Sequence, residues 1–184
     1  MKLLLYCTKA NPYLRKLDNY FLDNHKDNYY WSKGQTTPFN FNGKIVAECD
    51  FEVEEINYRN AKFVCNRYYL EILKKSCLTD KQMYDYLKGK NGYAIHIKNL
   101  HIFDEPRELS DFNKIIETPY GEEPDTIITK APQNMMRCCY EKKPKEWKTG
   151  VLISIKTQWL CKILNKEKTI EVRKKVLKEM YKNE

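Results

Sequence analysis

The sequence predicts one domain of the α+β class, mainly β, in which mostly antiparallel strands form a small barrel or curled sheet with two or three short helices. Three observations lead to this prediction. Apolar and polar residues alternate over 43–56, and residues 93–103 show the same strand pattern. Capping-box spacing near residue 80 marks a short helix. The 184 residues suffice for one core, and no apolar run is long enough for a membrane span.

The first third of the chain contains the clearest strand pattern. Residues 2–8 form an apolar strand, and 13–42 is expected to be a long surface loop. In 43–56 the small and apolar residues occupy one face of a strand and acidic residues the other. The acidic residues are Glu48, Asp50, Glu52 and Glu54. Residues 61–73 fit a strand followed by a helix.

The middle of the chain combines helix and strand signals. Thr79 and Gln82 have capping-box spacing and open a short helix that ends near Gly89. Residues 93–103 form a long strand, which should end at 104–106 because proline is poorly suited to a strand interior.

Two further strands are predicted after a loop. Residues 113–125 contain two prolines and a glycine, which favour a loop. Residues 135–140 and 150–156 are apolar enough to form strands.

The C-terminal segment predicts a strand, a helix and another strand. Thr157 can cap a short helix that runs through Leu164, and a strand follows over 168–173. In that strand Ile170 and Val172 should point into the core. A basic helix or tail is expected to follow the strand.

The polar residues of this last strand should lie side by side on its other face. They combine a hydroxyl, a carboxylate and a guanidinium, from Thr169, Glu171 and Arg173, and can contact a base edge or a phosphate. Lys156 and Lys168 add positive charge beside them. The alternative is that Glu171 and Arg173 only pair with neighbours on a solvated strand.

The net charge of +8 is concentrated at one end of the chain. Residues 142–184 contain 13 Lys and Arg against 5 Asp and Glu, whereas the two signs balance over the rest of the sequence. A local excess of this kind favours a polyanionic partner through counterion release. The alternative is a solvated lysine-rich tail.

These C-terminal residues resemble the signature of the ASCH family. The matching parts are Ile153-Ser154-Ile155-Lys156, Trp159, Lys162-Ile163-Leu164-Asn165 and Glu167–Arg173. The family pattern is a strand ending in lysine, a short helix and then G-x-K-x-x-E-x-R. Asn165 or Lys166 stands where the family usually has glycine. The resemblance implies a PUA-like barrel with a basic cleft that binds RNA or a modified nucleotide.

Shorter matches to ASCH proteins of phages and prophages cover most of the remaining chain in consistent order, but the signature itself is displaced. In the family the signature precedes the strand that here contains Tyr6-Cys7-Thr8-Lys9, whereas in this sequence it comes last. A circular permutation explains this order, because domain termini often lie close together. The predicted protein is then a monomer. The alternative is a swapped dimer in which each C-terminal segment completes its neighbour.

The resemblance also implies a set of binding residues. They are Lys156, Trp159, Lys168, Thr169, Glu171, Arg173, Tyr6, Thr8, Lys9 and Gln133. Lysine and arginine would hold phosphate, and Tyr6 or Trp159 would stack on a base. For Trp159 the alternative is a place in the core.

Two other functions follow from the same resemblance. Some ASCH relatives are amidohydrolases acting on acetylated cytidine, and others are reported ribonucleases. The hydrolases resemble K-T-x-T-x-R, but Glu171 replaces the second threonine, so binding is favoured over hydrolysis. If the protein is an enzyme, Lys168, Glu171 and Thr169 are the expected catalytic residues. The third possibility is a phage counter-defence protein that binds a host nucleic-acid-processing complex or ribonucleoprotein.

Cysteine and histidine usage favours a reducing compartment without a metal site. The chain has seven cysteines and three histidines, without a C-x-x-C pair or a clustered ligand pattern. We therefore expect no metal, no cofactor, no membrane association and a cytoplasmic location, in the host cell if the protein is phage-encoded.

Overall fold

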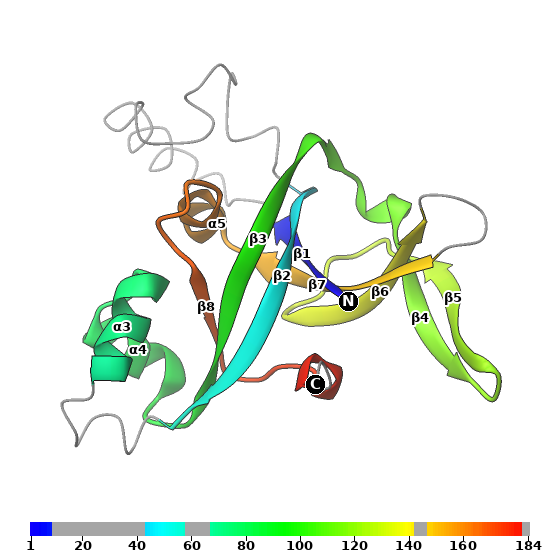
Figure 1. Ribbon diagram of the computed structural model, residues 1–184. Coiled ribbons are helices and arrows are strands. Elements are labelled where there is room, and N and C mark those ends of the chain that lie inside the picture. Colours follow the sequence, from blue (N-terminus) through cyan, green and yellow to red (C-terminus); the bar gives the residue numbers. More distant parts are fainter. Residues whose placement is uncertain (9–42, 58–66, 142–146, 182–184) are drawn as a thin grey trace. The chain divides into compact units, whose positions relative to one another are not determined.

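The computed structural model describes residues 1–8, 43–57, 67–141 and 147–181 (Figure 1). The strands are β1 (Lys2–Cys7), β2 (Ile45–Ile56), β3 (Gly92–Arg107), β4 (Asn113–Thr118), β5 (Gly121–Ile127), β6 (Met135–Glu141), β7 (Trp147–Ile155) and β8 (Ile170–Arg173). The helices are α3 (Arg67–Ser76), α4 (Asp80–Leu87) and α5 (Thr157–Leu164), with 3-10 turns η4 (Leu109–Asp111) and η5 (Lys178–Tyr181). The predicted α+β, mainly β class is confirmed. The expected loop at 13–42 lies outside the described residues.

The strands follow the order β5-β4-β6-β7-β1-β2-β3-β8. With β5 and β8 at its ends, this sheet is not closed, so the small barrel that was one of the two predicted forms is not confirmed. The strand pairs β1–β2, β3–β8, β4–β5, β4–β6 and β6–β7 are antiparallel, as predicted. The pair β1–β7 is parallel, with Leu3 opposite Val151 and Cys7 opposite Ile155.

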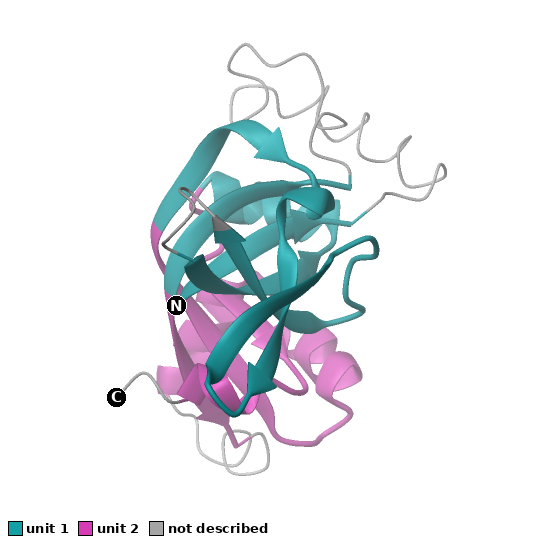
Figure 2. Cartoon of the chain, turned by 90° about the vertical axis from the view of Figure 1, so that its right-hand side faces the viewer, with its two compact units in different colours: residues 1–50, 100–165 teal, residues 51–99, 166–184 magenta. Residues whose placement is uncertain are grey.

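The chain divides into two compact units, and each consists of two separate stretches (Figure 2). Unit 1 contains Met1–Asp50 and Leu100–Asn165, and unit 2 contains Phe51–Asn99 and Lys166–Glu184. The chain passes from one unit to the other within β2, within β3 and after α5. The prediction of a single domain stays a prediction.

Unit 1 is built around side chains from five strands. Its core contains Leu4, Tyr6, Ile45, Phe103, Phe112, Ile128, Cys138, Tyr140 and Leu152. Consecutive residues of β1 and β7, which point to opposite faces of the sheet, are fully buried, as Leu4 and Leu5 are. These two strands are therefore covered on both faces, which explains their continuous apolar sequences.

Unit 2 packs α3 and α4 on a short stretch of sheet. Its core contains Ile56, Tyr69, Ile72, Met83, Leu87, Ala94, Ile170 and Val172. The prediction that Ile170 and Val172 point into the core is confirmed. The outer face of the sheet is polar, with β2 carboxylates contacting polar side chains of β3, as Glu54 does with His96 at 3.1 Å.

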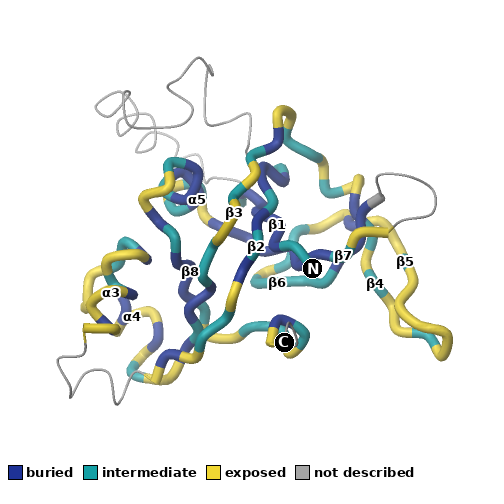
Figure 3. Tube along the Cα trace, in the orientation of Figure 1, coloured by how far each residue is buried: buried dark blue, intermediate teal, exposed yellow. Residues whose placement is uncertain are grey.

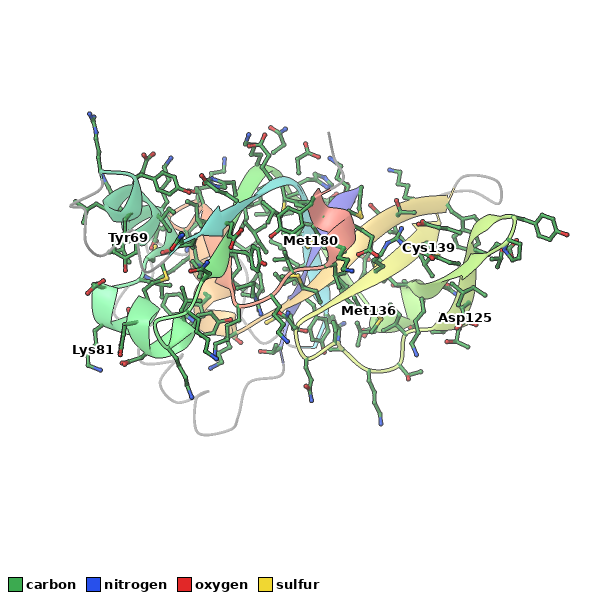
Figure 4. All side chains as sticks on the ribbon, turned by 90° about the horizontal axis from the view of Figure 1, so that it is seen from below. Tyr69, Lys81, Asp125, Met136, Cys139 and Met180 are labelled. Atoms are coloured by element: carbon green, nitrogen blue, oxygen red, sulfur yellow. The ribbon has the colours of Figure 1, made fainter. Side chains whose placement is uncertain are left out.

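The capping box predicted at residue 79 is confirmed. The Thr79 hydroxyl accepts a hydrogen bond from the Gln82 amide, while the Gln82 side chain accepts one from the Thr79 amide. The helix that follows is α4, and Lys88 ends it in the left-handed conformation. Figure 4 shows the side chains, with Lys81 on the outer side of α4, where it pairs with Asp85.

The predicted loop at 113–125 is wrong. These residues form the antiparallel hairpin β4–β5, which turns at Pro119 and Tyr120 and has Gly121 at φ 125°. Pro124 lies on β5, which is an edge strand and so has a hydrogen-bonded neighbour on one side only, the setting in which sheets accept proline. The predicted end of β3 at 104–106 is also wrong, because β3 continues through Pro106 to Arg107.

Two details of the C-terminal segment differ from prediction. Thr157 does not cap α5, because it is the first helical residue, and Lys156 occupies the cap position without a side-chain cap bond. The predicted strand at 168–173 is shorter, starting at Ile170. Leu160, Ile163 and Leu164 are buried and form the inner face of this helix.

Candidate functional site

Three charged side chains from the signature segment contact one another in unit 2. The Lys168 ammonium lies 3.3 Å from Glu171 Oε2, and Arg173 Nε lies 3.0 Å from Glu171 Oε1. The three side chains expose 2%, 10% and 12% of their surface, respectively. We call this group the charged triad. Its carboxylate is held between two cations. The residues of β8 are buried or half-buried (Figure 3), so this strand is not solvated as the alternative interpretation expected.

The end of helix α3 explains why Lys168 is buried. The N–H of Leu78 donates to the carbonyl of Leu73, and the N–H of Cys77 donates to that of Lys74. Cys77 has φ 55°, in the left-handed region. These are the two hydrogen bonds of a Schellman motif, with cysteine at the position where glycine is usual. The carbonyls of the last two helical residues, ending at Ser76, remain to be satisfied by other groups.

The signature segment supplies those two donors. The Thr169 N–H donates to the Lys75 carbonyl at 2.9 Å, and the Lys168 ammonium donates to the Ser76 carbonyl at 2.7 Å. The Thr169 carbonyl accepts a hydrogen bond from the Ile97 N–H on the other side. Lys168 and Thr169 therefore join α3 to the sheet, and the ammonium also meets the negative end of the helix dipole.

Burial changes the acid–base properties of Lys168. Desolvation lowers its pKa below the ordinary value of 10.5, and the negative charge of Glu171 opposes part of that change. The neutral form of this lysine is thus more accessible than that of a surface lysine.

The structure places Tyr86 near the charged triad, although the sequence contained no signal for it. Tyr86 lies on α4, one residue before the buried Leu87, and 38% of it is exposed. Burial raises the pKa of its hydroxyl, and the charges of Arg173 and Glu171 act on the same group in opposite directions. Only the packing of α4 beside β8 could reveal this neighbour.

The remaining predicted binding residues belong to unit 1. Tyr6 is 4% exposed and packs in the core, so its ring is not presented for stacking on a base. The Thr8 N–H donates to the Ile155 carbonyl, next to the exposed Lys156. Trp159 is half-buried on α5.

Gln133 lies near the same end of β7, because the residues on either side of it are hydrogen-bonded to Ser154 of that strand. The Ser154 hydroxyl donates to the Pro132 carbonyl at 2.6 Å, and the Ser154 N–H donates to the Asn134 carbonyl at 3.2 Å. Gln133 itself is exposed between them. Lys9 lies outside the described residues. The structure thus brings Thr8, Gln133 and Lys156 to the ends of two adjacent parallel strands, before the first turn of α5.

Neither a metal site nor a membrane helix is found in the part of the chain that the structure describes. Within those residues there is no group of three or more His, Cys, Asp and Glu side chains arranged to hold a metal ion. Among the described helices, none has the length and apolarity needed to cross a bilayer.

Comparisons with known proteins identify no relative. The chain matches no family model, no curated protein and no solved structure.

Proposed function

We propose that this protein binds RNA or a modified nucleotide, and that the charged triad belongs to an ASCH-like recognition site. The observation that carries the proposal is the burial of Lys168, Glu171 and Arg173 in contact with one another. Buried charges are costly and are concentrated at functional sites. A carboxylate that orients a guanidinium presents the planar donors that recognise a base edge or a phosphate.

The ASCH resemblance extends this proposal to the fold, as a PUA-like barrel with a circularly permuted chain. Unit 1 offers support, because the Tyr140 hydroxyl on β6 donates to Glu48 on β2 at 2.7 Å. These two strands are not neighbours in the sheet, so the sheet curls around the core they share. For the permutation, the support is that C-terminal β7 lies directly beside N-terminal β1.

Phosphate contacts are proposed at the end of β7 in unit 1. The first turn of α5 presents backbone N–H groups at the positive end of the helix dipole, and Lys156 adds an exposed positive charge there. Thr8 and Gln133 supply further polar groups at the same edge. The basic excess over 142–184 favours a polyanionic ligand.

The proposal is tested by identifying what copurifies with the protein. Nucleotides or RNA released from the purified wild type are identified by mass spectrometry and compared with those from Arg173→Ala. Binding of the identified RNA is then measured by fluorescence anisotropy. We expect Arg173→Ala to weaken binding about tenfold, as for a lost charge-assisted contact.

A matched control is Arg67→Ala, which removes an exposed arginine from the start of α3. This change should leave binding within about twofold of wild type, since a surface charge away from a contact matters little. Wild-type protein that carries no nucleotide, and binds neither RNA nor free nucleotides, would contradict the proposal.

Hydrolysis is a second candidate function, and the lowered pKa of Lys168 favours it. A lysine whose pKa is lowered loses its proton more readily, and in its neutral form it can accept a proton from water as the water attacks an amide carbonyl. On acetylated cytidine this reaction would release acetate and cytidine. Turnover of that substrate or of single-stranded RNA by wild type, and its loss in Lys168→Ala, would place hydrolysis above binding.

A further inference from the structure

Tyr86 and Lys174 form a partly exposed pair of an aromatic ring and a cation in unit 2. The Lys174 ammonium lies 5.0 Å from the centroid of the Tyr86 ring, within the range of a cation–π contact. The Tyr86 hydroxyl is also hydrogen-bonded to the Lys174 backbone. The ring is therefore held at both its edge and its face, while 38% of the residue stays accessible.

Close packing fixes this pair beside the charged triad. Gly92 is buried where α4 meets the end of β8, and a Cβ at this position would lie 2.6 Å from Leu87 and 3.1 Å from the Arg173 carbonyl. The absence of a side chain at Gly92 thus lets the Leu87 turn of α4 approach the last residue of β8. Tyr86 precedes Leu87 and Lys174 follows Arg173, so the same contact sets the position of both residues.

We propose that Tyr86 and Lys174 are a stacking platform for a nucleobase, with Lys174 holding the adjoining phosphate. This inference rests on the proposed function and names two of its binding residues. Every nucleobase has a face that can stack on the face of the tyrosine ring opposite Lys174, and the Lys174 ammonium can hold the phosphate of the same nucleotide. Lys175 and Lys178 follow Lys174 in the chain and extend the positive charge.

Tyr86→Ala and Tyr86→Phe test the role of the ring. The probe is fluorescein-labelled single-stranded RNA of mixed sequence, about 12 nucleotides long, with free AMP and CMP as separate arms. We expect Tyr86→Ala to weaken binding about tenfold, the usual effect of losing one stacked base. Tyr86→Phe keeps the ring and should change binding less than about twofold.

Tyr84→Ala is the matched control, because Tyr84 is an exposed tyrosine on the same helix, 47% accessible. Two positions apart on a helix, side chains do not face the same neighbours. If wild type binds RNA but not AMP or CMP, the platform is specific for RNA. If Tyr86→Ala weakens the binding of RNA and of mononucleotides to a similar extent, the platform is a free-nucleotide site. Thermal unfolding shows that each variant is folded.

The outcomes separate this inference from the function on which it rests. If RNA binding falls with Arg173→Ala but not with Tyr86→Ala, the platform is refuted and the proposed function stands. If Tyr84→Ala weakens binding as much as Tyr86→Ala, the effect belongs to α4 as a whole and the platform is again refuted. Wild type that binds neither RNA nor mononucleotides overturns both.

Discussion

Lys168 has a structural role that is independent of any ligand. Its ammonium satisfies the Ser76 carbonyl at the end of α3 and contacts the Glu171 carboxylate, both in a buried environment. A buried cation that satisfies two acceptors is costly to remove, because each acceptor then lacks a partner. A loss of activity in Lys168→Ala therefore has meaning only when the stability of the variant is known.

Lys168→Met is expected to destabilise the protein by about 2 kcal/mol at neutral pH, because methionine fills the space but leaves the Ser76 carbonyl unsatisfied. Urea unfolding monitored by circular dichroism measures this change. Lys90→Met, an exposed lysine after α4, should change the free energy of unfolding by less than about 0.5 kcal/mol. Equal effects at the two positions would show that the bonds to Lys168 contribute little.

The difference between wild type and Lys168→Met should also depend on pH. The pKa of Lys168 is lowered in the folded state from its ordinary value of 10.5, so above the folded pKa the unfolded chain binds more protons. Stability then rises with pH. The stability advantage of wild type should thus grow on going from neutral pH to 10.5 and level off above it. Urea titrations of both proteins across this pH range measure the difference in stability. If the stability advantage of wild type shrank as the pH rose, the pKa of Lys168 would be raised in the folded state and not lowered.

At the scale of elements, short-range sequence signals predicted helix α4 correctly but did not predict the β4–β5 hairpin. The capping box at Thr79 predicted the start of α4 correctly, because its hydrogen bonds join residues three apart in the chain. The β4–β5 hairpin was missed, because its prolines and glycine resemble those of a loop. An edge strand tolerates Pro124, and only the sheet order shows that β5 is at the edge.

Thr79→Ala is expected to lower the free energy of unfolding by about 1 kcal/mol, since it removes the hydroxyl that accepts from the Gln82 amide. Chemical denaturation checks this value. The control is Thr129→Ala, an exposed threonine outside the described helices and strands, which should be nearly neutral. A Thr79→Ala variant as stable as the control would mean that water replaces the cap.

At the scale of the whole molecule, the charge pattern is the main clue to a partner. The excess of Lys and Arg over 142–184 includes both buried members, such as Lys168, and exposed members, such as Lys156. Only the exposed charges are free to exchange counterions with a polyanion, so the contribution of this segment to binding is smaller than its net charge suggests.

Binding of single-stranded RNA should therefore weaken about tenfold when salt rises from about 50 to about 200 mM, the dependence expected for a few phosphate contacts. Fluorescence anisotropy titrations at several salt concentrations measure the slope. An uncharged nucleoside is the control, because its binding should hardly respond to salt. RNA binding that is independent of salt would rule out phosphate contacts as its main source.

The sequence by itself determined the mainly β class, most strand positions, the capped helix and the core-facing side of β8. These features depend on periodicity and short-range hydrogen bonds, which a linear pattern records. Only the tertiary structure decided that Lys168, Glu171 and Arg173 are buried, that Tyr6 is a core residue and that Tyr86 lies near Arg173. In each case the deciding contact comes from a segment distant in sequence. The end of α3 covers Lys168, the core of unit 1 encloses Tyr6, and the close approach of α4 to β8 at Gly92 brings Tyr86 near Arg173. Burial and neighbourhood depend on such packing, so they could not be inferred from the signature alone.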